Sequence, residues 1–183
     1  MSTVNIIRTM NVLIAEDEYD IALLYKTALE NRKHHVTITY NGEDCLKTYN
    51  EEFQKKIFTT CATERMPFDV VILDYKIPQV SGIGVAEEIL AINPHQRIIF
   101  VSAYVKEFLE DSIKKLKQFV ELRQKPFGLN ALIDTIEDKD AYKELQNLDV
   151  DIDVVKAVNP THEQITDLLD KLRDVQKARA FQL

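Results

Sequence analysis

The chain has 183 residues, of which 45% are hydrophobic and 29% charged, a size that suits one domain with an appendage or two small domains. Its net charge of -7 argues against a broad nucleic-acid-binding surface. Two cysteines form no disulfide framework and no apolar run is long enough to span a membrane. The first residues lack the basic and apolar regions of a signal peptide, so we expect none. We therefore expect a cytoplasmic protein with no membrane attachment.

Short apolar strands alternate with amphipathic helices along most of the chain. The patterns predict strands at 10–15, 35–40, 69–74, 97–103 and 119–122, and helices at 21–30, 43–65, 84–92, 107–116 and 130–145. Asp20 is the expected cap of the first helix, and the second helix is expected to break around residues 59–63. Continuous apolar strands separated by helices indicate an α/β fold with a parallel sheet covered on both faces.

Polar side chains lie at the end of every predicted strand except the second. They are Glu16, Asp17 and Glu18 after the first strand, Asp74 and Ser102 within the ends of the third and fourth, and Lys125 after the fifth. Because the carboxyl ends of parallel strands lie at one edge of a sheet, we expect these groups to lie together. Pro78 and Gly82 are expected to turn the chain after Asp74 and leave its carboxylate open.

This set of side chains suits phosphoryl chemistry. The carboxylates of Glu16, Asp17 and Asp74 would repel one another unless a cation lay among them, and oxygen ligands favour Mg²⁺. Lys125 supplies a positive charge and Ser102 a hydroxyl donor. An aspartate between magnesium and a lysine is a plausible nucleophile toward phosphorus, and both cations would neutralise phosphoryl oxygens in the transition state.

Four segments resemble, in order, the receiver domain of two-component response regulators. They are VLIAEDE (12–18), VVILDYKIPQVSG (70–82), FVSA (100–103) and QKPF (124–127). The resemblance covers residues 10–145 and implies a flavodoxin-like, doubly wound sheet of five parallel strands in the order 2-1-3-4-5, here with an extra C-terminal helix. It also implies a protein that is not an enzyme, beyond catalysing its own phosphorylation and dephosphorylation.

The resemblance assigns a metal site to the acidic edge. Asp17, Asp74 and the backbone carbonyl of Lys76 would bind Mg²⁺, and Glu16 would act mainly through bound water. Other phosphate-handling classes fit less well: the chain has no P-loop for an NTPase. The acid that haloacid dehalogenases need two residues after the nucleophile is here Lys76.

The resemblance also assigns roles in phosphorylation. Asp74 would accept a phosphoryl group from the phosphohistidine of a sensor histidine kinase. Ser102 would donate a hydrogen bond to the phosphoryl group, and Lys125 would pair with it. Pro126 matches the cis-proline of the family, so we expect a cis Lys125–Pro126 bond.

The chain departs from the family at several places. Ile77 replaces the usual methionine, and Leu122 replaces the usual switch aromatic, which leaves the switching mechanism open. The segment 42–68 is longer than usual, so we expect an extended second helix or an inserted turn. We hypothesise that Tyr104 shields the acyl phosphate from water. The four histidines are scattered and are expected at the surface rather than as metal ligands: His34, His35, His95 and His162.

Residues 146–183 are expected to form a second region, an acidic connector and an amphipathic helix. The helix carries one apolar stripe, formed by Ile165, Leu168, Leu169, Leu172 and Val175. The stripe would either pack back onto the receiver, residues 10–145, or form a dimer seam or a docking face for another protein. The favoured function is therefore a phosphorylatable receiver that signals through protein–protein contacts or dimerisation. The alternatives are a transcription regulator acting through this helix, for which DNA contact is not favoured, and an aspartyl-phosphate phosphotransfer enzyme.

Overall fold

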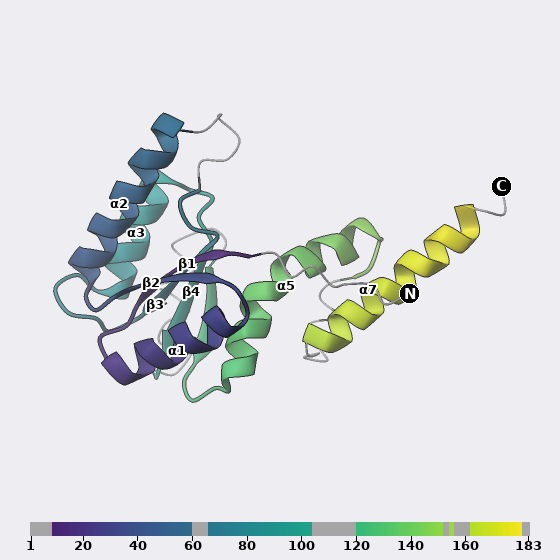
Figure 1. Cartoon of the computed structure of the whole chain (residues 1–183), viewed down its shortest axis with the longest axis horizontal. Coiled ribbons are helices and arrows are strands. Elements are labelled where there is room, and N and C mark those ends of the chain that lie inside the picture. The colour runs from purple at the N-terminus through teal and green to yellow at the C-terminus, as the bar shows by residue number, and fades with distance from the viewer. Residues whose placement is uncertain (1–8, 60–65, 104–119, 152–153, 156–161, 181–183) are drawn as a thin grey trace. The chain divides into compact units, whose positions relative to one another are not determined.

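A computed structural model describes residues 9–59, 66–103, 120–151, 154–155 and 162–180 (Figure 1). The chain divides into two compact units, a first unit of residues 1–127 and a second unit of residues 128–183. Tyr104, Cys61 and the helix expected at 107–116 lie outside the described residues. Within the described ranges, no helix is both long enough and apolar enough to cross a membrane.

The first unit is built on a parallel sheet of five strands. The strands are β1 (Asn11–Ala15), β2 (His35–Thr39), β3 (Val70–Asp74), β4 (Ile98–Ser102) and β5 (Val120–Gln124). Their order is β2-β1-β3-β4-β5, and every neighbouring pair is parallel. This confirms the predicted doubly wound fold. The strand order reverses between β1 and β3, where such sheets bind their ligands.

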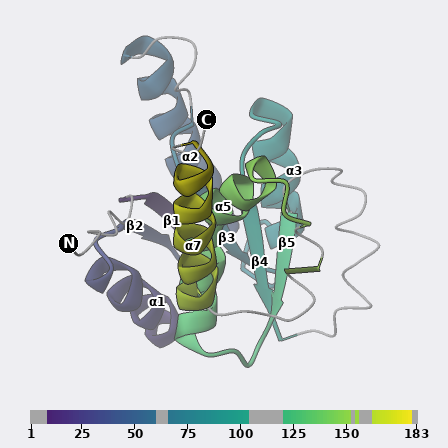
Figure 2. The ribbon, with the colours of Figure 1, turned by 90° about the vertical axis from the view of Figure 1, so that its right-hand side faces the viewer.

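Helices cover both faces of this sheet because its central strands are apolar up to their last residues, Asp74 and Ser102. All five residues of β3 and all five of β4 are buried. Figure 2 shows α1 (Tyr19–Asn31) on one side of the sheet and α2 (Gly42–Thr59) and α3 (Gly82–Ile92) on the other. Alternate strand residues point to the α2–α3 face and form a core cluster with these helices: Leu13, Ala15, Val71, Leu73, Ile98 and Phe100.

The first helix begins earlier than predicted. α1 starts at Tyr19, and Asp20 lies in its first turn, so the prediction of Asp20 as the cap is wrong. The N-cap is Glu18, whose backbone is extended and whose carbonyl accepts the first helical hydrogen bond, from Ala22 N at 2.9 Å. The negative charge of Asp20 interacts favourably with the helix dipole there.

The end of α1 buries a histidine that was expected at the surface. Lys33 has a φ of 70°. His34 N donates to Leu29 O at 3.1 Å, and Lys33 N donates to Glu30 O at 2.9 Å, the two hydrogen bonds of a Schellman motif. His34 is only 3% exposed, and its Nδ1 accepts a hydrogen bond from Met10 N at 3.2 Å. The reversal of the chain after α1 therefore turns this side chain inward, and the surface prediction for His34 is wrong.

The turn after β3 is made differently from the prediction. Its left-handed residue is Gln79, with a φ of 68°, whereas Gly82 is the first residue of α3. Ser81 is the N-cap, and its hydroxyl accepts a hydrogen bond from Gly84 N at 3.3 Å. Gly82 is required for another reason, because a Cβ there would lie 2.2 Å from the backbone oxygen of Asp74.

The second helix is long, in agreement with the extended 42–68 segment. α2 runs for 18 residues and ends at Thr59, at the start of the predicted break. Cys45 is buried on it. Tyr49 Oη donates to Gln96 Oε1 at 2.9 Å, and Gln96 Nε2 donates to Phe68 O at 3.1 Å. This buried polar network fixes the middle of α2 against the loops beside β3 and β4.

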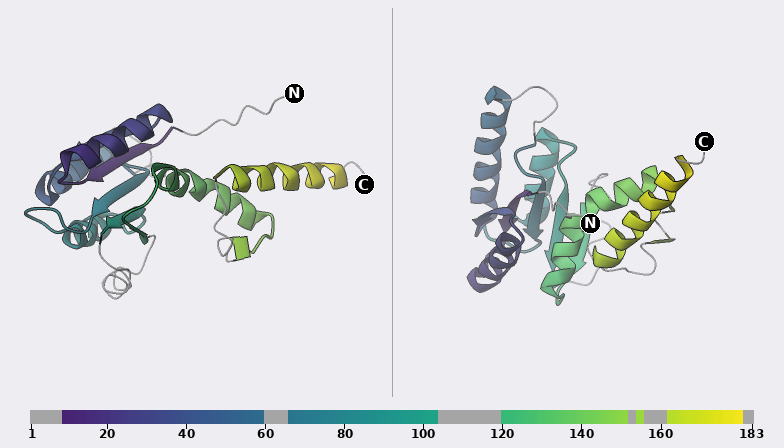
Figure 3. Two further views of the ribbon diagram at one scale, coloured as in Figure 1. Left: turned by 90° about the horizontal axis from the view of Figure 1, so that it is seen from below. Right: turned by 45° about the vertical axis from the view of Figure 1, so that its right-hand side comes forward.

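The second unit contains α5 (Leu129–Asn147) and α7 (His162–Ala180), which pack side by side (Figure 3). Leu145, Ile165 and Leu169 are its buried centre. Half-buried apolar residues pack around them: Leu148, Val150, Val155, Leu168 and Leu172. Val175, the last member of the predicted stripe, is 49% exposed. Most of the stripe therefore packs within the second unit, on the end of α5. The expected division between 145 and 146 stays a prediction.

Candidate functional site

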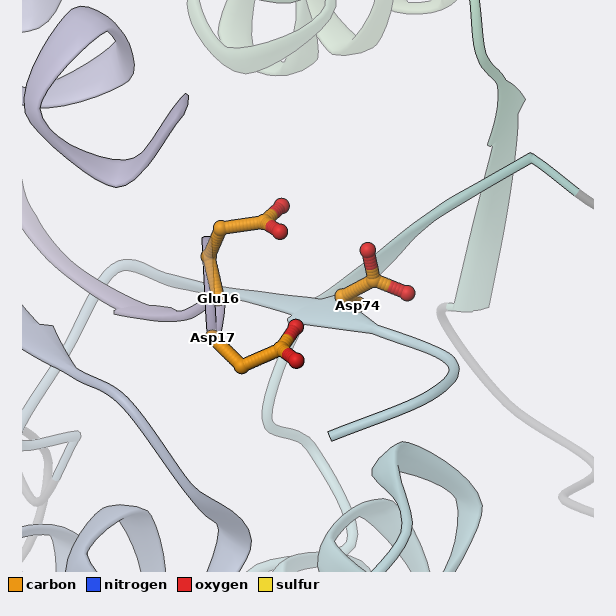
Figure 4. Close-up of side chains that lie close together, drawn as sticks. All are labelled: Glu16, Asp17 and Asp74. Carbon is orange, nitrogen blue, oxygen red and sulfur yellow. The ribbon is translucent and has the colours of Figure 1, made fainter. Parts of the chain in front are cut away.

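Three carboxylates meet at the carboxyl edge of the two central strands. Ala15 and Leu73 are register partners, so Glu16 and Asp17 follow β1 beside the point where Asp74 ends β3. Figure 4 shows the three acidic side chains directed toward a common space. One oxygen of each lies within 4.8 Å of the others. The sheet thus brings together the acidic residues that the sequence places at these strand ends.

Lys125 completes the cluster from the end of β5. Its Nζ donates to Asp74 Oδ2 at 2.6 Å and to Glu16 Oε2 at 2.8 Å. Its backbone N donates to Ser102 O at 2.6 Å, which ties the segment after β5 to the end of β4. Ser102 itself is fully buried. The Lys125–Pro126 peptide bond is cis, as predicted.

Burial shapes the ionisation of these groups. Burial raises the pKa of Glu16 to about 7, and the neighbouring charge of Asp74 acts in the same direction, against the hydrogen bond from Lys125. Burial alone would lower the pKa of Lys125. Its hydrogen bonds to Asp74 and Glu16 and their negative charges outweigh burial and raise that pKa, so Lys125 carries its positive charge in the folded protein.

The donor set fits a magnesium ion. Three carboxylates face one ammonium group, which leaves net negative charge when all are ionised. Glu16 Oε1 is buried and has no hydrogen-bond partner among the described residues, so it is an acceptor available to a cation or its water. Asp17 is exposed and leaves the cluster accessible from solvent. An accessible group of oxygen ligands is what Mg²⁺ prefers in proteins.

The roles expected for Lys76, Leu122 and Tyr104 go beyond the contacts described above. Lys76 N donates to Asp74 Oδ1 at 3.0 Å, which orients the carboxylate; the Lys76 carbonyl as a ligand stays a prediction. Leu122 pairs with Phe100 across β4 and β5 and packs half-buried against the core. The shielding role of Tyr104 also stays a prediction.

Sequence reasoning missed an aromatic pair beside the site. Tyr25 on α1 is 5% exposed and stacks on Phe127, with ring centroids 5.9 Å apart and ring planes 17° apart. Burial raises the pKa of Tyr25 to about 12, and the charges of Lys125, Glu16 and Asp74 also act on it. By its spacing in the sequence, Tyr25 belongs to the apolar face of the helix predicted at 21–30. Its position about two helical turns after the acidic pair is the signal that could have identified it.

Comparisons with known proteins agree with this geometry. The model of the response regulator receiver domain matches residues 12–137. Among curated proteins, the chain is similar to the response regulator receiver protein CpdR of Brucella abortus, with 27% identity over 126 residues that cover 69% of this chain and 92% of that protein. A solved receiver domain protein from Clostridium thermocellum is similar at a TM-score of 0.56 and 26% identity, covering 74% of this chain and 98% of that one.

A further solved structure is similar and contains a metal. It is the response regulator TrrA of Thermotoga maritima in complex with Mg²⁺-BeF, with a TM-score of 0.53 and 27% identity, covering 70% of this chain and 96% of that one. The matched family region ends inside α5 and does not reach α7.

Proposed function

We propose, since this chain belongs to the response regulator receiver family, that Asp74 accepts a phosphoryl group from the phosphohistidine of a sensor histidine kinase. The observation that carries the proposal is the position of Asp74, whose carboxylate shares one cluster with Glu16, Asp17 and Lys125. We place this reaction in the cytoplasm. Phosphorylated Asp74 would then change how the protein contacts other proteins.

The transfer exchanges one bond to phosphorus for another. A carboxylate oxygen of Asp74 forms the new P–O bond while the P–N bond of the donor breaks. The imidazole leaves with the electron pair of that bond and takes up a proton. The hydrogen bond from Lys76 N to Asp74 Oδ1, at 3.0 Å, holds the carboxylate in a defined orientation for attack.

Lys125 and Ser102 would stabilise the transferred group. Lys125 Nζ already lies 2.6 Å from Asp74 Oδ2, so a phosphoryl group on this carboxylate would be within its reach. Its charge would offset the negative charge on the phosphoryl oxygens. The hydroxyl of Ser102, at the end of the neighbouring strand β4, would donate a hydrogen bond to one of these oxygens.

Asp17, Asp74 and the carbonyl of Lys76 would hold Mg²⁺, with Glu16 contributing through water. When bound, the ion neutralises charge on the acidic cluster and on the phosphoryl oxygens. The partnerless Oε1 of Glu16 and the excess of carboxylates over ammonium support this assignment.

The phosphorylated state would be read through protein–protein contacts. The stripe on α7 is largely packed onto α5 inside the second unit, so these side chains are already used within the chain. The net charge of -7 argues against a broad nucleic-acid-binding surface. These observations support a downstream protein partner rather than DNA as the output.

The proposal is tested by phosphorylating the full chain with phosphoramidate and Mg²⁺. Intact mass should show one added phosphoryl group that hydroxylamine removes, and Asp74→Asn should abolish it. Asp69→Asn is the matched control, because Asp69 precedes the same strand and its Oδ2 accepts a hydrogen bond from Asn11 N at 2.8 Å. Asp69→Asn should be labelled as wild type is. Label that persists in Asp74→Asn would overturn the assignment of the phosphoacceptor.

A further inference from the structure

The Tyr25–Phe127 stack lies next to Lys125 in the chain. Lys125 and Phe127 are two residues apart, on either side of Pro126, in the segment that follows β5. The segment is held at one end by the hydrogen bond from Lys125 N to Ser102 O, at 2.6 Å. At the other end the Phe127 ring stacks on Tyr25 of α1.

Those two attachments join the segment to elements on both sides of it. The hydrogen bond fixes its backbone to β4, while the stack fixes it to α1, the helix that begins just after Glu16 and Asp17. The Lys125 side chain extends from the backbone between the hydrogen bond to Ser102 and the stack with Tyr25, and it is 15% exposed. Its four-carbon stem has many rotamers, so a single orientation needs support from the surrounding structure.

We propose that Tyr25 and Phe127 act as positioning residues that hold the Lys125 ammonium group at the acidic cluster. The inference rests on the proposed function, because it gives Lys125 its role toward the phosphoryl group. Neither aromatic residue touches the reacting atoms. They act through the backbone of residues 125–127, which carries the lysine side chain.

The ring, rather than the hydroxyl, makes the stack. Tyr25→Phe should therefore keep the Lys125 ammonium group at the acidic cluster. Tyr25→Leu and Phe127→Leu should let it move away from the cluster. Because Tyr25 is deeply buried, Tyr25→Leu can lose stability for unrelated reasons. Phe127 is only half-buried, so Phe127→Leu is the primary variant.

The chain offers a matched control in another stacked Tyr–Phe pair. Tyr49 and Phe53 stack within α2, with centroids 6.2 Å apart and ring planes 14° apart. Phe53 is half-buried, like Phe127, and packs against the core rather than at the acidic cluster. Phe53→Leu should lower the free energy of unfolding without changing the position of the Lys125 ammonium group.

The first measurement reports on Lys125 without any phosphorylation. In ¹⁵N-labelled full-length protein, the Nζ signal of Lys125 is assigned by its absence from Lys125→Arg. Its hydrogen bonds to Asp74 and Glu16 should protect it from exchange with water. We expect the signal to persist in wild type, Tyr25→Phe and Phe53→Leu, and to be lost or shifted to the free-lysine position in Phe127→Leu.

The second measurement is the rate of phosphorylation by phosphoramidate. Phe127→Leu should slow it about tenfold, the size of effect expected from a displaced charge. The Mg²⁺ dissociation constant from calorimetry should not rise, since the carboxylates are retained and a competing positive charge has been displaced from two of them.

An Nζ signal and a rate in Phe127→Leu equal to those of Phe53→Leu would overturn the positioning role. Loss of the Nζ signal in Tyr25→Phe would also contradict it, because the ring is retained. If wild type takes no phosphoryl label, the proposed function fails, and the Nζ signal still decides whether the stack positions Lys125.

Discussion

Replacing Gly82 by alanine should disturb the fold at the site itself. The added Cβ would lie 2.2 Å from the backbone oxygen of Asp74, 3.1 Å from its carbonyl carbon and 3.2 Å from the Cα of Tyr75. All three atoms belong to the backbone that ends β3, so no side-chain rotation relieves the overlap. The start of α3 must instead move away from β3 by about 1 Å, since tolerable contacts begin near 3 Å.

The cost can be worked from these contacts. Overpacking of a tight contact costs about 1–3 kcal/mol. The same movement weakens the hydrogen bond from Gly82 N to Tyr75 O, now 3.1 Å, which contributes about 1 kcal/mol. We therefore expect Gly82→Ala to lower the free energy of unfolding by about 2–4 kcal/mol.

Gly84→Ala is the matched control in the same helix. A Cβ there would meet only the side chains of Val80, at 3.0 Å, and Ser81, at 3.6 Å. Alanine is also a better helix former than glycine by up to about 1 kcal/mol. This variant should stay within about 1 kcal/mol of wild type.

Urea denaturation of both variants, followed by circular dichroism, measures the difference. Equal stabilities for Gly82→Ala and Gly84→Ala would refute the argument that backbone contact with Asp74 requires glycine at 82. The Nζ signal of Lys125 provides a second readout, because it should persist if only α3 moves and be lost if Asp74 leaves its 2.6 Å hydrogen bond to that group.

Three further predictions concern the helix end, the metal and pH. Lys33→Gly should raise the free energy of unfolding by about 1 kcal/mol in urea denaturation, because Lys33 has a left-handed backbone at a φ of 70°; Lys33→Ala should bring no such gain. Mg²⁺ at about 10 to 100 times its dissociation constant should stabilise the protein by roughly 1.4 to 2.7 kcal/mol in thermal unfolding, and an equal gain in Asp17→Asn would argue against Asp17 as a ligand. Burial raises the pKa of Cys45 from 9.0 to about 12, against the hydrogen bond with Thr39. The unfolded thiol ionises first, so the stability gained by keeping Cys45 neutral is complete below pH 9 and is lost as the pH rises toward 12. The free energy of unfolding of wild type, measured relative to Cys45→Ala, should therefore fall between pH 8 and pH 10, and a constant difference would contradict the raised pKa.

The strands and the site edge could be predicted because local patterns encode them. Continuous apolar runs such as 70–73 indicate buried parallel strands, and the structure has a strand at each of the five predicted places. In a parallel sheet, the carboxyl ends of all the strands lie at the same edge. Listing the polar residues after each strand was therefore enough to expect Glu16, Asp17, Asp74 and Lys125 together, and their carboxylates and ammonium do meet.

Local boundaries were less predictable where two signals compete. Asp20 and Glu18 can both begin a helix, and the choice depends on the backbone entering from β1. His34 follows a helix and looks like a surface residue by its type. The Schellman motif at Lys33 turns it inward instead, where Met10 N donates to its ring.

By itself, the sequence of this protein determined the α/β fold, the order of its elements and the edge of the sheet that carries the acidic residues. Only the tertiary structure decided that Lys125 donates hydrogen bonds to both Asp74 and Glu16, the latter 109 residues away in the chain. It likewise paired Tyr25 with Phe127 and made Gly82 a contact to the Asp74 backbone. Periodicity records which face of an element is apolar. It does not record which atoms from distant elements meet at that face, because such contacts depend on how the packed elements approach one another.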